Sequence, residues 1–137
     1  MAADSSGLYI SDNGNNRVLY YTGIATTATR VYGQGGSFAA NTANNGGISA
    51  DSLNSPKGVA ADTTGLYIAD QANNRVLFYP GTVTTATRVY GQAGSFTANV
   101  ANNGGISAKS LESPCGVGLY STGVYIVDSG NNRVLLY

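Results

Sequence analysis

The chain has 137 residues, enough for one compact domain, and its seven Lys and Arg residues are balanced by seven Asp and Glu residues. It has no histidine and one cysteine, Cys115, so it lacks the commonest general base and the commonest metal ligand, and an internal disulfide cannot form. We therefore expect no catalytic residue, cofactor or metal, no nucleic-acid partner for this neutral chain, and no membrane insertion, because no apolar run approaches about 20 residues.

The N-terminal sequence, Met1-Ala-Ala-Asp4, does not have the pattern of a secretory signal peptide. We interpret it as a start within a longer sequence, or as a mature or engineered beginning. The residues that follow are rich in Gly, Ala, Ser, Thr, Asn and Tyr and poor in Leu, Glu, Lys and Arg. This composition favours strands and turns over helices, and therefore an all-β fold. Together with the low charge, it indicates an extracellular or cell-surface setting in a bacterium.

One sequence unit recurs along the chain with a period of 58 residues. Gly7-Leu-Tyr-Ile-Ser-Asp12 returns as Gly65-Leu-Tyr-Ile-Ala-Asp70 and again as Gly123-Val-Tyr-Ile-Val-Asp128. No insertion or deletion disturbs the spacing, which is the signature of a repeat architecture. We divide the single domain 1–137 into repeats 1–58 and 59–116 and a partial repeat 117–137.

Within the second repeat the pattern predicts four strands joined by tight polar turns: Gly58–Ala61, Leu66–Ala69, Arg75–Tyr79 and Thr87–Tyr90. Because Leu66 and Ile68 point to one face and Tyr67 to the other, the sheet must be covered on both sides. Stacking such sheets around an axis covers both faces, and the small residues of the first strand suit a crowded axis. The pattern predicts a β-propeller of four-stranded antiparallel blades.

Three stretches of the second repeat resemble the NHL-repeat β-propeller family: Pro56–Asp62, Gly65–Asp70 and Asn73-Asn-Arg-Val-Leu-Phe-Tyr79. The resemblance recurs in full or in part in all three copies. It departs from the family at the Asn-His-Leu stretch that names it, where an Asn holds the His place and Arg-Val follows. Propeller repeats usually have about 40 residues, so each unit here carries an Asn/Gly/Ser-rich insertion, between Gly33 and Pro56 and between Gly91 and Pro114.

The chain holds about three blades, the last without its outer strand, and three blades cannot close a ring of the usual 4–8. The resemblance implies about six blades, which two chains would complete. We therefore expect the chain to bind a second copy of itself as a homodimer. Two alternatives are that it is a piece of a longer natural or engineered array, and that head-to-tail association stays open and forms a filament.

An aspartate ends the second strand of each copy, and an arginine opens the third. We expect a hydrogen-bonded Asp–Arg or Asp–backbone brace, with intervening asparagines in left-handed conformation that cap their own turns. A Ca²⁺ site is the functional alternative, although the clusters lack the carboxylate density of a calcium loop. The structural motif is predicted at Asp12, Asn16, Arg17, Asp70, Asn74, Arg75, Asp128, Asn132 and Arg133.

The insertion is the part that the fold does not require, and loops on a rigid scaffold are where binding usually occurs. We expect it on the same face as the Asn-rich turn, held down by Phe38, Phe96, Ile48, Ile106, Leu53 and Leu111. A ligand or partner surface is predicted at Asn41, Asn44, Asn45, Asn99, Asn102 and Asn103. The alternative is that the loop packs on its neighbour and binds nothing.

Other polar and aromatic side chains have two interpretations each. Arg30 and Arg88 in the outer strand either protect a sheet edge from aggregation or bind a partner. Tyr9, Tyr67 and Tyr125 either pack between blades or form a stacking platform for sugars. Cys115 takes the place of Lys57 in the previous copy, and no base is at hand to activate it, so we interpret it as an incidental thiol.

These observations predict a non-catalytic scaffold or binding module that self-associates, with the insertion-bearing face as the surface for a glycan or protein ligand. A carbohydrate-binding, lectin-like propeller and an extracellular filament-forming protein are the alternatives. Some NHL-like propellers are lyases that depend on histidines, and others bind RNA through a basic face. This chain has neither feature, so we do not expect an enzyme.

Overall fold

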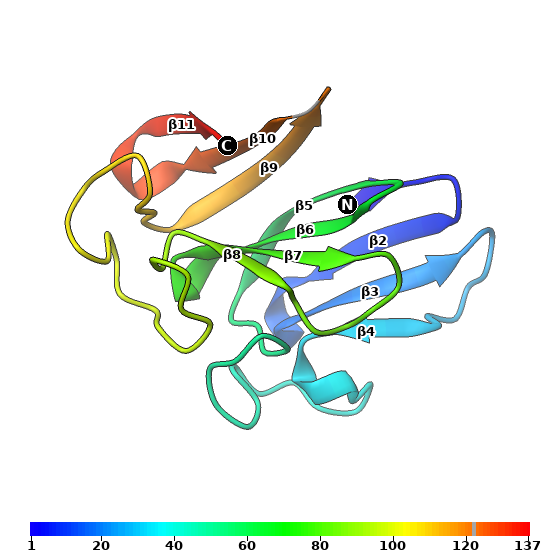
Figure 1. The fold of residues 1–137 in the computed structure, drawn as a ribbon. Coiled ribbons are helices and arrows are strands. Elements are labelled where there is room, and N and C mark those ends of the chain that lie inside the picture. Colours follow the sequence, from blue (N-terminus) through cyan, green and yellow to red (C-terminus); the bar gives the residue numbers. More distant parts are fainter. Residues whose placement is uncertain (122) are drawn as a thin grey trace.

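The computed structural model describes residues 1–121 and 123–137 and is all-β, with three antiparallel sheets that follow one another along the chain (Figure 1). Sheet 1 consists of β1 (Ala2–Ala3), β2 (Gly7–Asp12), β3 (Arg17–Thr22) and β4 (Arg30–Tyr32). Sheet 2 consists of β5 (Pro56–Asp62), β6 (Gly65–Asp70), β7 (Arg75–Pro80) and β8 (Arg88–Tyr90). Sheet 3 consists of β9 (Pro114–Tyr120), β10 (Gly123–Asp128) and β11 (Arg133–Leu136). The predicted all-β class is confirmed.

In each sheet, strands that are consecutive in the chain are also neighbours in space. The four strands predicted for the second repeat are all present, and the first is longer than expected because it begins at Pro56. Its register against β6 shifts between Pro56 and Val59. The outer strand begins at Arg88, one residue later than expected.

Short 3-10 turns join the second and third strands of each sheet: Asn13–Asn15, Gln71–Asn73 and Ser129–Asn131. The residue after each turn is an asparagine in the left-handed region, with φ of 54° at Asn16, 53° at Asn74 and 52° at Asn132. Asparagine tolerates this conformation better than most residues, which explains its recurrence at these positions.

Two apolar cores lie between consecutive sheets. The first packs Tyr9, Val18 and Tyr20 of sheet 1 against Leu66, Ile68, Leu77 and Tyr79 of sheet 2. The second packs Tyr67, Ala69, Val76 and Phe78 of sheet 2 against Val124 and Ile126 of sheet 3. Every residue of β6 is buried, as the apolar residues on both of its faces predicted.

The first strands of sheets 2 and 3 approach each other closely. A Cβ atom on Gly58 would lie 2.6 Å from Cα of Gly116 and 2.8 Å from the carbonyl oxygen of Cys115. A larger residue at this point would force the two backbones apart. Crowding therefore explains why a glycine occupies position 58.

The insertions, residues 33–55 and 91–113, lie at the end of the sheets that carries the 3-10 turns. In Figure 1 the first is the cyan-to-teal loop at the bottom and the second the yellow loop at the left. This location agrees with the prediction. In the part of the chain that the structure describes, no helix has the length and hydrophobicity needed to cross a membrane.

The expectation that six apolar residues hold the insertions down is partly wrong. Leu53 and Leu111 are fully buried, and Phe96 packs against the core between sheets 1 and 2. Phe38, the equivalent of Phe96, is 48% exposed, and Ile106 is 70% exposed. The ring of Phe38 has no apolar core to pack against, because no described sheet lies beside the outer face of sheet 1.

Candidate functional site

An Asp–Arg ion pair recurs at the start of the third strand of each sheet. The distance from arginine Nε to aspartate Oδ2 is 2.7 Å for Asp12–Arg17, Asp70–Arg75 and Asp128–Arg133. The third residue of each 3-10 turn, an asparagine, donates its side-chain amide to the same carboxylate. The expected brace is therefore present in all three copies.

The central arginine, Arg75, holds both insertions. Its side chain is fully buried, and Nη1 donates to the carbonyl oxygen of Phe96 in the second insertion. Its Nη2 donates to the carbonyl oxygens of Ser49 at 3.0 Å and Ser52 at 2.9 Å in the first insertion. A buried ion pair is stable only when further hydrogen bonds offset its desolvation, and here the insertions supply them.

The two outer arginines have only part of these partners. Arg17 Nη1 donates to Phe38, whereas its Nη2 has no partner among the described residues. Arg133 Nη2 donates to the carbonyl oxygen of Ser110 at 2.8 Å, whereas its Nη1 has no partner in residues 1–121 and 123–137. Among the described residues, Arg17 and Arg133 therefore each have one terminal guanidinium nitrogen without a partner, at the position where the same nitrogen of Arg75 binds an insertion.

Desolvation and hydrogen bonding act in opposite directions on the paired carboxyl groups. At Asp12, burial raises the pKa, but the hydrogen bonds from Arg17 and Asn15 lower it by more, so the pKa lies below its ordinary value. At Asp70, complete burial raises the pKa, and Arg75 and the amides of Asn54 and Asn73 oppose this effect.

Asn16 and Asn74, which follow the first two 3-10 turns, hold the insertions with their side chains. Asn16 Nδ2 donates to the carbonyl oxygen of Asn41 at 3.0 Å, and its Oδ1 accepts from the backbone N–H of Ser55 at 2.9 Å. Asn74 makes the same contacts with residues 99 and 113. The prediction that asparagine side chains cap their own turns is therefore wrong for Asn16 and Asn74. It is right for Asn15, Asn73 and Asn131, which bind the aspartate at the start of their own turn.

Most of the asparagines predicted as a ligand surface are bound within the protein. Asn44 and Asn73 exchange side-chain hydrogen bonds of 3.0 and 2.7 Å, and Asn102 and Asn131 repeat this pair at 3.1 and 2.7 Å. These four amides join each insertion to the 3-10 turn of the next sheet. They contribute to the structure of the junction.

The remaining predicted asparagines differ in their contacts. Asn45 and Asn103 donate weakly, over 3.3 and 3.4 Å, to Gln34 and Gln92 at the start of their own insertions. Asn41 and Asn99 are exposed and bind the scaffold through main-chain carbonyl groups only. The structure therefore does not gather the six amides into one site, and their ligand-binding role stays a prediction.

The arginines of the outer strands lie over aromatic rings. The guanidinium carbon of Arg30 is 4.5 Å from the ring centre of Tyr20, and that of Arg88 is 5.3 Å from the ring centre of Phe78. Such cation–π contacts hold the charge at the sheet edge. A pocket of about 240 Å³ beside Arg30 also contains Asp4 and Asp62.

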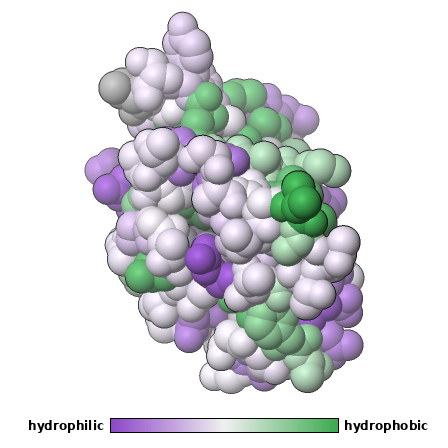
Figure 2. Space-filling view, turned by 90° about the vertical axis from the view of Figure 1, so that its right-hand side faces the viewer, coloured by the Kyte–Doolittle hydropathy of each residue, from purple (hydrophilic) through white to green (hydrophobic). Residues whose placement is uncertain are grey.

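Figure 2 shows the side of the molecule on which the loop between β3 and β4 lies. Near-neutral residues cover most of this side, and hydrophobic residues form separate patches. Among the described residues, no group of three or more His, Cys, Asp or Glu side chains is placed to hold a metal ion. Cys115 is a half-buried free thiol.

The tyrosines of the second strands have different environments. Tyr9 and Tyr67 are buried in the cores between sheets, which agrees with the packing interpretation. Tyr125 is 38% exposed because it lies on the side of sheet 3 that faces away from sheet 2. It shares this outer face of sheet 3 with Val127, Val134 and Leu136.

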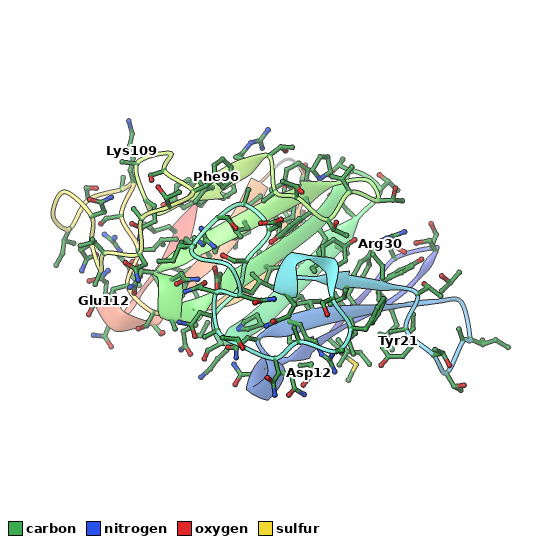
Figure 3. All side chains as sticks on the ribbon, turned by 90° about the horizontal axis from the view of Figure 1, so that it is seen from below. Asp12, Tyr21, Arg30, Phe96, Lys109 and Glu112 are labelled. Atoms are coloured by element: carbon green, nitrogen blue, oxygen red, sulfur yellow. The ribbon has the colours of Figure 1, made fainter. Side chains whose placement is uncertain are left out.

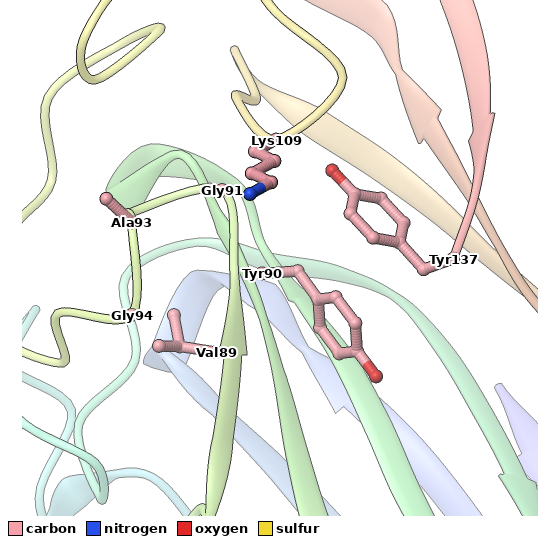
Figure 4. A pocket seen from close by; sticks show the side chains of 7 residues that line it. All are labelled: Val89, Tyr90, Gly91, Ala93, Gly94, Lys109 and Tyr137. Carbon is pink, nitrogen blue, oxygen red and sulfur yellow. The ribbon is translucent and has the colours of Figure 1, made fainter.

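A pocket of about 450 Å³ opens at the junction of sheets 2 and 3 (Figure 4). The rings of Tyr90 and Tyr137 meet edge to face with centres 5.0 Å apart, and Lys109 of the second insertion lies at the rim. Burial raises the pKa of Tyr137, and its buried hydroxyl makes no hydrogen bond to any of the described residues. Figure 3 shows Lys109 and Glu112 on the second insertion and Asp12 at the end of sheet 1.

Sequence reasoning missed this pocket. Lys109 replaces Asp51 of the previous copy, and that change was a signal that the two junctions differ.

Comparison with models of protein families finds no match to this chain, and comparison with curated proteins finds none. The resemblance to NHL repeats therefore remains a prediction from sequence motifs.

Proposed function

We propose that this chain is a non-catalytic β-propeller scaffold that completes its fold by binding a second copy of itself. Three antiparallel sheets in chain order, neighbouring pairing of consecutive strands, and closely packed first strands all support a propeller arrangement. The motif residues around Arg75 act in this proposal as internal braces. The exposed amides of Asn41 and Asn99 are the parts of the insertion-bearing face that remain free for a ligand or partner at the cell surface.

The outer face of sheet 3 is the observation that carries the proposal. Val134 is 59% exposed and Leu136 is 61% exposed. Their equivalents in sheet 2, Val76 and Phe78, are 0% and 8% exposed because sheet 3 covers them. The same pattern of apolar residues is thus buried in one sheet and left open in the next.

The covering surface is present on the same molecule. The outer face of sheet 1 consists of half-buried apolar residues: Leu8, Ile10, Leu19 and Tyr21. They are equivalent to Leu66, Ile68, Leu77 and Tyr79, which form the sheet 2 side of the first core. The outer face of sheet 3 in one chain therefore matches the outer face of sheet 1 in another. Two such contacts close a six-bladed ring of two chains.

The mass in solution, measured by light scattering, tests this proposal. We expect twice the chain mass of 14.0 kDa, independent of concentration above the dissociation constant. A mass of one chain at all concentrations would show that the outer faces do not pair. A large, polydisperse mass would mean that association is head to tail and does not close.

A further inference from the structure

The outer strand makes the same contacts in sheets 1 and 2. β8 pairs with β7 through Val76 and Tyr90, Leu77 and Val89, and Phe78 and Arg88. β4 pairs with β3 in the same register. In sheet 3 the equivalent edge of β11, Val134–Leu136, pairs with no strand among the described residues. The edge therefore has backbone groups free for a further strand.

The chain that follows each outer strand also has fixed partners. Gln92 Nε2 donates to the carbonyl oxygen of Asn74 at 2.9 Å, and Gln34 does the same to Asn16 at 3.0 Å. Arg75 Nη1 donates to the carbonyl oxygen of Phe96. In sheet 3 the equivalent groups are the carbonyl oxygen of Asn132 and Nη1 of Arg133, and neither has such a partner in the described part of the chain.

The pocket of Figure 4 lies at the junction of sheets 2 and 3. Its position corresponds to the one that, at the junction of sheets 1 and 2, is filled by apolar side chains of the outer strand and of the segments beside it. At the junction of sheets 1 and 2, Ala86, Val89 and Phe96 pack into the core beside Tyr32 and Tyr79, which are 0% exposed. At the junction of sheets 2 and 3, the equivalent tyrosines, Tyr90 and Tyr137, line the open pocket.

A backbone contact shows the same difference. The N–H of Ala86 donates to the carbonyl oxygen of Ala50 at 2.9 Å. Ala108, the equivalent of Ala50, is exposed, and its carbonyl oxygen accepts no such bond from the described residues. The strand edge, the free Arg133 donor, the free carbonyl groups and the pocket thus form one continuous site along sheet 3.

We propose that this site binds an extended peptide of the form Ala-Thr-Arg-Val-Tyr-Gly-Gln with a Phe four residues later, added as a fourth strand to β11. The valine and phenylalanine enter the pocket, the glutamine amide donates to Asn132, and the phenylalanine carbonyl accepts from Arg133. Strand addition of this kind takes affinity from main-chain hydrogen bonds and specificity from side-chain pockets. The site is separate from the outer face of sheet 3, so the proposal holds whether or not two chains associate.

A synthetic peptide of residues 84–100 tests the proposal on the intact chain. Calorimetry should give one peptide per chain, and hydrogen exchange should slow at the N–H groups of Val134 and Leu136, which face the open edge of β11. A matched peptide with Val89→Glu should bind about tenfold more weakly or worse, because a charge replaces a buried apolar side chain. A peptide with Gln92→Ala should also bind more weakly, and both controls leave the protein unaltered.

Three results would overturn the proposal. One is no binding up to about 1 mM of the parent peptide. Another is equal affinity for the parent and the Val89→Glu peptide, which would mean that the pocket is not used. The third is protection of the Val134 and Leu136 N–H groups before peptide is added, which would show that the edge of β11 is not open.

Discussion

At the scale of single residues, one motif has three environments. The side chain of Arg75 is fully buried between two insertions, whereas those of Arg17 and Arg133 are 18% and 25% exposed. The Asp–Arg distance is the same in each copy, so the ion pair itself depends on local sequence. The number of further partners depends on whether a neighbouring sheet and its insertion are present.

Arg75→Lys tests the role of the central arginine. Lysine keeps the charge but cannot reproduce the contacts to Asp70 and both insertions, so we expect the free energy of unfolding to fall by about 3 kcal/mol. The matched variant Arg17→Lys should cost about 1 kcal/mol or less. Urea unfolding measures both, and equal losses would show that the insertion contacts contribute little.

Asp62→Asn tests a pH effect at the turn between β5 and β6. Burial raises the pKa of Asp62, but hydrogen bonds from Thr64 and Gly65 lower it by more, so the folded pKa lies below 3.8. The carboxylate therefore stabilises the fold above that pH, and the effect is lost as the pH falls through the folded pKa. The stability difference between wild type and variant should be largest near neutral pH. A difference that persists unchanged at low pH would contradict this explanation.

At the scale of elements, two glycines show where neighbouring segments approach too closely for a larger residue. Gly58 lies against Gly116, and Gly91 adopts a φ of 100° at the start of the second insertion, where a Cβ would lie 2.8 Å from the carbonyl oxygen of Asn74. Both positions require glycine, but for different reasons. At Gly58 a side chain would clash with the neighbouring strand, and at Gly91 the backbone has a positive φ that other residues rarely adopt.

Gly58→Ala tests the crowding of the first strands. The added methyl group would meet the backbone of β9, so we expect a loss of about 1–3 kcal/mol in the free energy of unfolding. Gly118→Ala is the matched control, because a Cβ at Gly118 meets no atom within 4 Å. It should change stability by less than about 0.5 kcal/mol. Similar effects of the two substitutions would mean that the strands can separate without cost.

At the scale of the whole molecule, the buried faces of sheet 2 show what the outer faces of sheets 1 and 3 lack. Sheet 2 is covered on both sides, and each outer sheet on one. The exposed residues of sheet 3 are the same kinds of residue that sheet 2 buries. Self-association would remove this apolar surface from water, which is the main driving force for most protein association.

Val134→Glu tests whether this surface mediates association. Val134 is 59% exposed in the single chain, so the free energy of unfolding should change by less than about 0.5 kcal/mol, while the proposed dimer should weaken about tenfold or more. The control Val83→Glu alters a residue that is 47% exposed and lies after β7, away from the outer faces. Light scattering at several concentrations compares the two. An unchanged mass for Val134→Glu would locate the interface elsewhere.

The sequence by itself determined the repeat, the strands and the Asp–Arg brace. These features depend on contacts within a few residues, such as Asp70 opposite Arg75, and the 58-residue period repeats them in register. The alternation at Leu66, Tyr67 and Ile68 also predicted a sheet buried on both faces. Local sequence and local geometry agree in each case.

Only the tertiary structure decided which copy of a residue is buried and which asparagines are free. Phe38 and Phe96 occupy the same place in the repeat. Phe96 packs against the core between sheets 1 and 2, whereas Phe38 is exposed because no described sheet packs against the outer face of sheet 1. Asn44 binds Asn73 across a separation of 29 residues, a contact that composition cannot reveal. The pocket at Tyr90 and Tyr137 likewise exists because a repeated sequence meets different neighbours at each position along the array.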